Sequence, residues 1–130
     1  MREDLLAIRD LLDIYAQGFH EGNIEKLQQV FHPQCHLYSA PQGELIDDDM
    51  ISVYERVAHR IKPAERGDPF YFEVLTLDQS GPDCAFARLK LGLGDKLFTD
   101  YLTWLKIDGR WWVITKTFTA EMRPDVAPLA

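Results

Sequence analysis

The chain has 130 residues, 46% of them hydrophobic and 27% charged, and its 21 acidic against 14 basic residues give a net charge of −7. This length and composition fit one globular domain over residues 1–130 and argue against a disordered chain or a membrane-spanning helix. The negative charge, with no cluster of basic residues, argues against nucleic acid or an anionic membrane as a partner.

The first helix is predicted over residues 3–21, where apolar side chains recur at helical spacing and Gly22 follows as a stop signal. The same segment lacks the uninterrupted apolar core of a secretory signal, so we expect a cytoplasmic protein. Asn23 is a good N-cap for a short second helix over residues 24–30, which Pro33 stops.

A short extended piece follows at residues 35–39, before a turn that contains Pro and Gly. The acids Asp47, Asp48 and Asp49 are typical of a helix N-terminus and predict a third helix that reaches about Arg60. Residues 62–69 read as a polar loop.

After Phe70 the apolar pattern changes to a period of two, which predicts strands separated by short turns with Gly. The predicted strands are about 70–79, 84–93, 97–107 and 111–120. The last residues, about 122–130, are expected to be a loose tail.

Symmetric closure of each hairpin predicts which side chains share a face of the sheet. It pairs Val74 with Leu89, Leu89 with Asp100, and Asp100 with Thr117. The resulting face is almost wholly apolar and should lie under the helices, with Asp100, Thr115 and Thr117 as its polar exceptions.

The opposite face mixes charges with large apolar groups, including Tyr101, Trp112, Lys116 and Phe118. Such a surface predicts a homodimer interface. A one-residue bulge in a strand would exchange these face assignments beyond the bulge.

The motifs YAQGFHEGNIEKLQQVFHPQC and FTDYLTWLKIDGRWWVITKTF resemble the nuclear-transport-factor-2-like superfamily, in particular its lumazine-binding branch, and the resemblance covers nearly the whole chain. It implies a cone-shaped α+β fold, also described as a cystatin-like α+β roll. Three N-terminal helices would pack on a curved antiparallel sheet, with a ligand pocket between them. The branch name implies a bound heterocycle, but this fold hosts both enzymes and non-catalytic binders.

Asp100 is the first candidate for chemistry, because a carboxyl on an apolar face loses hydration of its charged form unless a partner offsets the loss. A protonated Asp100 would donate a hydrogen bond to a ligand oxygen; alternatively it only binds Thr115, Thr117 or a helix end. Tyr15 faces the same side, and the two resemble the oxyanion-binding pair of ketosteroid isomerases. Those isomerases also need a carboxylate base where this chain has Ser39, so proton abstraction is not supported.

His36 is the best remaining base if it faces the pocket, and a surface residue if Cys35 and Leu37 are core. Neither cysteine, Cys35 or Cys84, has metal-ligand spacing, and both are expected to be buried free thiols. With no phosphate-binding glycine loop either, we expect no metal and no cofactor.

Aromatic and polar side chains are candidates to line a pocket for a flat ligand, although most of the aromatics are equally explained as core. The candidate ligand-binding residues are Tyr15, Phe19, Phe31, Tyr54, Phe72, Leu89, Asp100, Trp104, Thr115 and Thr117.

Three functions remain open from the sequence. The first is a homodimeric protein that binds a small apolar or aromatic molecule, anchored by Tyr15 and Asp100. The second is an isomerase or dehydratase that uses Asp100 with His36 or water for proton transfer. The third is a dimeric interaction module with a filled pocket, and the missing carboxylate at Ser39 favours the first and third.

Overall fold

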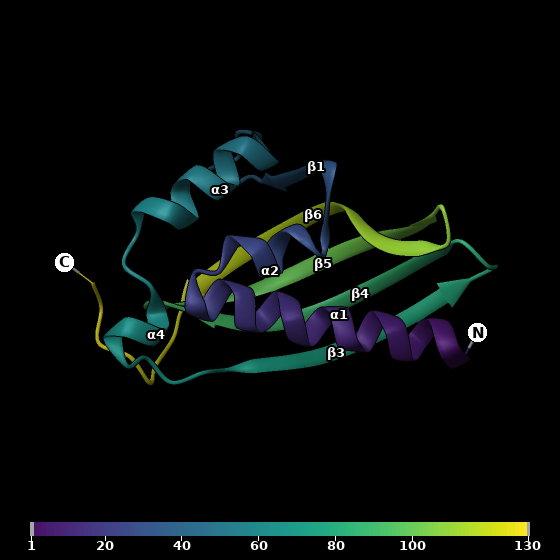
Figure 1. Ribbon diagram of the computed structural model, residues 1–130. Coiled ribbons are helices and arrows are strands. Elements are labelled where there is room, and N and C mark those ends of the chain that lie inside the picture. Colours follow the sequence, from purple (N-terminus) through teal and green to yellow (C-terminus); the bar gives the residue numbers. More distant parts are fainter. Residues whose placement is uncertain (1, 130) are drawn as a thin grey trace.

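The computed structural model describes residues 2–129 as a sheet with helices packed against it (Figure 1). The helices are α1 (Arg2–Glu21), α2 (Ile24–Gln28), α3 (Met50–His59) and α4 (Pro63–Arg66). The strands are β1 (Phe31–Ser39), β2 (Ile46–Asp49), β3 (Phe72–Ser80), β4 (Cys84–Leu93), β5 (Lys96–Ile107) and β6 (Arg110–Met122).

The six strands form one sheet in the order β2-β1-β6-β5-β4-β3. β1 runs parallel to β6, and the other neighbouring strands of residues 2–129 run antiparallel. Figure 1 shows α1 and α2 lying across one face of this sheet, with α3 beside β1. The expected α+β fold is therefore present, with a mixed sheet in place of a wholly antiparallel one.

The apolar stripe of α1 faces the sheet, as its spacing predicts. Its buried side chains include Ile8, Leu12, Tyr15 and Phe19. Gly22 follows the helix at φ +64°, a left-handed conformation that glycine adopts without the steric cost of a Cβ atom.

The second helix is shorter than predicted, because the chain joins the sheet as soon as α2 ends at Gln28. The Val113 amide donates to the carbonyl of Val30 at 2.9 Å, and Phe31 pairs with Val113 in β6. Pro33 lies inside β1, where the register with β6 is interrupted and its missing N–H is tolerated.

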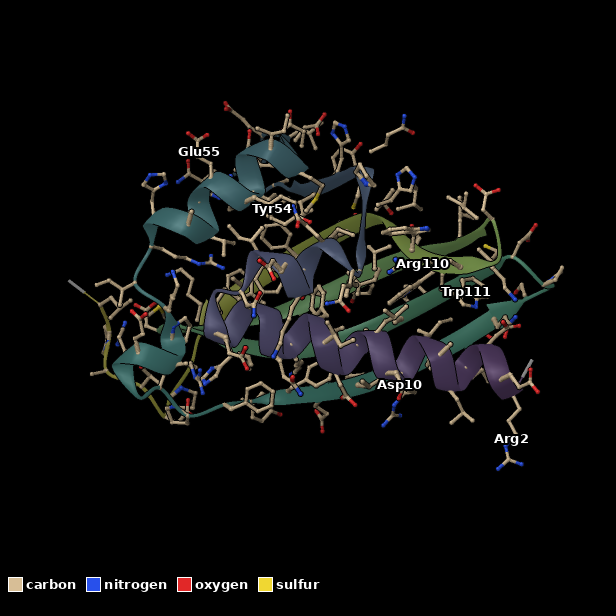
Figure 2. The ribbon with its side chains drawn as sticks, in the orientation of Figure 1. Arg2, Asp10, Tyr54, Glu55, Arg110 and Trp111 are labelled. Atoms are coloured by element: carbon tan, nitrogen blue, oxygen red, sulfur yellow. The ribbon has the colours of Figure 1, made fainter. Side chains whose placement is uncertain are left out.

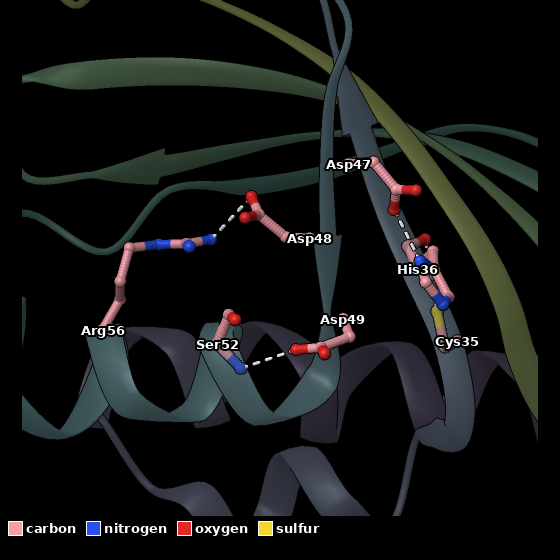
Figure 3. Close-up of polar contacts among 7 residues, drawn as sticks. All are labelled: Cys35, His36, Asp47, Asp48, Asp49, Ser52 and Arg56. Atoms are coloured by element: carbon pink, nitrogen blue, oxygen red, sulfur yellow. Dashed lines mark hydrogen bonds and ion pairs between the residues drawn. The ribbon is translucent and has the colours of Figure 1, made fainter.

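Helix α3 begins later than predicted, because the acids before it form strand β2. Asp49 alone caps the helix, accepting a hydrogen bond from the Ser52 amide at 2.9 Å (Figure 3). The expected polar loop at 62–69 contains the single-turn helix α4, which Gly67 ends. Residues 2–129 thus contain four helices, and β1 and β2 lie between the second and the third.

The predicted pairing of β4 with β5 holds along the whole hairpin. Between β3 and β4 it holds up to Val74, and beyond the extra place at Leu75 it is shifted by one residue. Val74 pairs with Leu89, and Leu89 pairs with Asp100. These two hairpins place Asp100 on the face covered by the helices, where its side chain is fully buried.

A bulge overturns the predicted pairing between β5 and β6. Trp104 pairs with Val113 as symmetric closure predicts, but Thr103 pairs with Thr115 because Ile114 occupies an extra place in β6. Asp100 therefore pairs with Phe118 and not with Thr117.

Beyond this bulge the two faces of β6 are exchanged relative to the prediction. Thr115 and Thr117 do not share the face of Asp100, and the side-chain hydroxyl of Thr115 is hydrogen-bonded to that of Thr103. Lys116, which the sequence places on the outer face, is only 5% exposed and lies under the helices with Phe118.

The segment after β6 is tied to the domain, so the prediction of a loose tail is wrong for residues up to 129. Arg123 is 4% exposed and donates to the Pro69 carbonyl at 3.0 Å and to Asp125 at 2.7 Å. The Leu129 amide donates to Asp95 at 2.8 Å.

The cysteines differ in their surroundings. Cys35 is fully buried beneath α3 and Cys84 is exposed, so the prediction of two buried thiols is wrong for Cys84. Both are free thiols. Separately, every helix within residues 2–129 is too short or too polar to cross a membrane.

Candidate functional site

A cavity of about 240 Å³ lies between the helices and the covered face of the sheet. Its wall is mostly apolar and is built from α1, α3 and four strands. Apolar residues on this wall include Phe19, Leu37, Val57, Leu91, Phe98 and Phe118. The cationic side chains Arg56, Arg60 and Lys116 complete the wall, so the cavity combines an apolar surface with positive charge.

Three buried polar side chains meet at the inner end of this site. The Tyr15 hydroxyl on α1 donates a hydrogen bond of 2.5 Å to Asp100 Oδ2 on β5. The amino group of Lys116 on β6 lies 3.5 Å from the same oxygen. The other carboxylate oxygen, Asp100 Oδ1, is buried and has no hydrogen-bond partner within the described residues.

The Lys116 amino group is surrounded by aromatic rings. It lies 4.7 Å from the ring centre of Phe19, 5.2 Å from that of Phe118 and 5.3 Å from that of Tyr15. The ring faces attract the ammonium, but they replace water only in part. Burial therefore lowers the pKa of Lys116, and the charge of Asp100 offsets part of this effect.

The Tyr15 hydroxyl is held in its neutral form. Burial raises the pKa of Tyr15 well above its ordinary value, and the nearby charge of Asp100 raises it further. Tyr15 is thus a hydrogen-bond donor throughout the physiological pH range.

Arg60 provides a second, half-buried cation at the end of α3. Its guanidinium lies 5.8 Å from the ring centre of Phe19, and burial lowers the pKa of Arg60. Its Nη2 atom is buried and has no hydrogen-bond partner among residues 2–129. A buried guanidinium nitrogen without a partner favours binding of an oxygen acceptor.

Arg56 differs from Arg60 because an acid already pairs with it. Its Nη2 donates to Asp48 Oδ2 on β2 at 3.2 Å (Figure 3). The charges of Arg56 and Asp48 cancel, as do those of Lys116 and Asp100, so Arg60 leaves the site with one excess positive charge.

His36 lies outside the cavity, at the surface. This is one of the two placements that the sequence left open. Its Nδ1 is 2.5 Å from Asp47 Oδ1 (Figure 3). Its ring stacks on that of Tyr38. The His36 side chain is 40% exposed, and neither its hydrogen bonds nor its ring contacts involve Asp100.

The predicted aromatic residues divide between the cavity and the core. Phe19 lines the cavity, whereas Phe31, Leu89 and Trp104 are buried in the core. Phe72 packs against the core from the sheet.

Tyr54 is the predicted pocket residue on α3. Figure 2 shows Tyr54 pointing from α3 toward the body of the domain and Glu55 pointing away from it. Burial raises the pKa of Tyr54 to about 12, so its hydroxyl stays protonated like that of Tyr15.

Sequence reasoning missed Lys116 and Arg60. A signal for Lys116 was present, because the predicted inner face of the last strand carried two threonines while Phe118 was assigned to the outside. A bulge after Val113 removes this conflict. The position of Arg60 in the cavity wall depends on where α3 ends. The sequence has no comparable signal that indicates this position.

Within residues 2–129 no group of three or more His, Cys, Asp or Glu side chains is arranged to hold a metal ion.

Comparisons with known proteins agree with this architecture. An aldolase, FrzH, from Cladobotryum sp is 22% identical over 116 residues, which cover 84% of this chain and 85% of the aldolase. A crystal structure of an NTF2-like protein from Shewanella baltica has a TM-score of 0.83 at 19% identity, covering 93% of this chain and 96% of that one. A ketosteroid isomerase-like protein from Erwinia carotovora atroseptica has a TM-score of 0.73 at 15% identity, covering 95% of this chain and 100% of that one.

The structural likenesses establish the nuclear-transport-factor-2-like fold, as the sequence motifs predict. A sequence-family model described as "Putative lumazine-binding" matches residues 3–119. The match covers the helices and strands that build the cavity, except for the first residue of α1 and the last residues of β6. The chain therefore belongs to the "Putative lumazine-binding" family within the nuclear-transport-factor-2-like superfamily.

Proposed function

We propose that the cavity binds a small, mostly apolar or aromatic molecule that carries one acidic oxygen. The observation that carries this proposal is the buried, unpartnered Nη2 of Arg60 in an apolar wall. An anionic oxygen would supply the missing acceptor and cancel the excess charge. A charge-assisted hydrogen bond of this kind contributes roughly 1.5–3 kcal/mol.

The size of the cavity supports a small ligand. Its volume of about 240 Å³ is slightly below the usual range of ligand pockets, roughly 300–1,000 Å³. An adjoining hollow of about 470 Å³ shares Arg60, Leu93 and Phe98 with it, so a longer ligand has room to extend past the guanidinium.

This proposal changes the polar anchors expected from the sequence. Tyr15 and Asp100 contact each other and Lys116, so Lys116 and Arg60 take the place of that pair as the groups offered to a ligand. The alternative of an isomerase with His36 as base lacks support, because His36 pairs with Asp47 at the surface. An interaction module with a filled pocket is also disfavoured by the cavity.

Two relatives suggest ligand classes for this site. The family description names lumazine, a flat bicyclic heterocycle, which matches an aromatic ligand with an acidic group. The name of the related aldolase suggests a second ligand class, aldehydes and ketones, because aldolases act on such carbonyl compounds.

The test uses three matched aromatic probes: 2-naphthoate, 2-naphthamide and lumazine. Calorimetric titration should show 2-naphthoate binding about 10-fold or more tightly than 2-naphthamide, from the energy of the charge-assisted bond. Arg60→Gln should remove this preference and leave the affinity for 2-naphthamide nearly unchanged. Arg9→Gln, which removes an exposed arginine of α1, is the matched control and should keep the preference.

Equal affinity for 2-naphthoate and 2-naphthamide would contradict the proposal, as would a preference that survives Arg60→Gln. Failure of all three probes to bind at millimolar concentration would count against an open cavity.

The homodimer remains a proposal as well. Large side chains on the face away from the helices are exposed, including Tyr101 at 41% and Leu105 at 37%. Light scattering after gel filtration should give the mass of a dimer, and Tyr101→Lys should shift it toward the monomer. A monomer at micromolar concentration would contradict this expectation.

A further inference from the structure

The Lys116 amino group is placed differently from a surface lysine. It lies in the wall of the cavity and is the one amino group there among residues 2–129. Its residue is 5% exposed, and three aromatic rings surround the amino group. A ligand in the cavity therefore meets this nitrogen in surroundings that hold little water.

Asp100 is placed to exchange a proton with Lys116. Its Oδ2 atom lies 3.5 Å from the Lys116 nitrogen, and Tyr15 fixes the carboxylate by donating to the same oxygen. Moving one proton from the ammonium to the carboxylate replaces two buried charges with two neutral groups. Burial lowers the pKa of Lys116 and so reduces the cost of releasing that proton.

From this geometry we infer that Lys116 captures a small, mostly apolar aldehyde or ketone as an imine, with Asp100 as its proton partner. The inference rests on the cavity of the proposed function but not on the role of Arg60. It names a second ligand class, carbonyl compounds, and a covalent step that simple binding does not include.

The chemistry balances with the groups present. Lys116 gives a proton to Asp100, and the free amine forms a bond to the carbonyl carbon while the C=O π bond breaks. The proton from the attacking nitrogen moves to the former carbonyl oxygen, which gives a carbinolamine. Asp100 then returns its proton to that hydroxyl, water leaves, and a protonated imine forms beside the Asp100 carboxylate. The net reaction converts ammonium and carbonyl into iminium and water.

The test uses 2-naphthaldehyde with cyanoborohydride, which reduces an imine to a stable secondary amine. Peptide mapping by mass spectrometry should locate the label at Lys116 at least about 10-fold faster than at the exposed Lys96. The labelling rate at Lys116 should rise by less than about 10-fold per pH unit near neutrality, because burial lowers the pKa of its amine.

Two variants separate capture from simple proximity. Lys116→Arg keeps a cation beside Asp100 but has no primary amine, so the fast label should disappear. Asp100→Asn should slow the labelling of Lys116 and change its pH profile, because the amine loses its proton partner. Mapping of the wild-type protein alone decides the matter if a variant does not fold.

Labelling of Lys116 no faster than that of Lys96 would overturn the inference. Preferred binding of 2-naphthoate without this label would leave the proposed function standing. A fast label at Lys116 without any preference for 2-naphthoate would support the imine and refute the role of Arg60.

Discussion

The buried Lys116–Asp100 pair should show a large coupling energy in a double-mutant cycle. The variants are Lys116→Met, Asp100→Asn and the combined change, each close in size to the residue that it replaces. At a separation of 3.5 Å and an effective dielectric constant of about 20, the attraction between the charges is about 5 kcal/mol.

The unfolding free energy that each single variant can lose has an upper limit, because the charged partner left behind can become neutral by gaining or losing a proton. Near pH 7 this costs about 4 kcal/mol for an ordinary carboxyl and about 5 kcal/mol for an ordinary amine. Because the losses of the two single variants sum to the coupling energy when the double variant is close to wild type, we expect each single variant to lose about 2–3 kcal/mol of unfolding free energy. The double variant should be close to wild type or more stable, because removing both charges also removes their desolvation cost.

Urea unfolding followed by tryptophan fluorescence and circular dichroism measures all four corners of the cycle. The matched control is Lys96 with Asp95, an ion pair at the same distance of 3.5 Å in which the lysine is half exposed. Its coupling should stay within about 0–1 kcal/mol. A coupling below about 1 kcal/mol for the buried pair would refute the reasoning that Lys116 and Asp100 rest as an ion pair.

Three further predictions follow from other parts of the structure. Ellman's reagent should react with one thiol of the folded protein, Cys84, and with Cys35 only after unfolding. The reason is that burial raises the pKa of Cys35 to about 12. Two reactive thiols in the folded state would contradict this. Hydrogen bonds from Gln79, Trp111 and Lys106 hold the pKa of Asp4 well below the ordinary value of a carboxyl, about 3.9. Their stabilisation is therefore present above about pH 4 and is lost as pH falls further. Asp4→Asn should therefore lower the melting temperature at neutral pH and flatten its fall between about pH 4 and pH 2, and an unchanged acid profile would contradict this. Gly92→Ala should cost about 1–3 kcal/mol in urea unfolding, because the added Cβ would overlap the buried Arg123 guanidinium, and an unchanged midpoint would show that Arg123 moves aside.

The fold was predictable where local patterns decide it. The stripe of α1 and the β4–β5 hairpin follow from side-chain spacing and turn residues, which also fix the pairing of Leu89 with Asp100. The parallel pairing of β1 with β6 has no such local signal. It joins segments far apart in the chain, and Pro33 gave a misleading indication that no strand starts before residue 35.

The site was predictable only in part, because one residue changes its composition. Tyr15 and Asp100 could be placed on a common face, and the structure brings their oxygens within 2.5 Å. The extra place taken by Ile114 exchanges Thr115 for Lys116 on that face. An alternating pattern alone does not locate a bulge. The sequence therefore predicts the hydroxyls of Thr115 and Thr117 on this face, where the structure has the buried amine of Lys116.

The parallel contact between β1 and β6 also constrains when the protein can fold during its synthesis. β1 reaches the sheet only through β6, the last strand of the chain, and β2 depends in turn on β1. A nascent chain on the ribosome therefore carries the apolar face of β1 without its partner β6 until β6 has emerged. The cavity wall, which includes Leu37 on β1, closes only after translation of almost the whole domain.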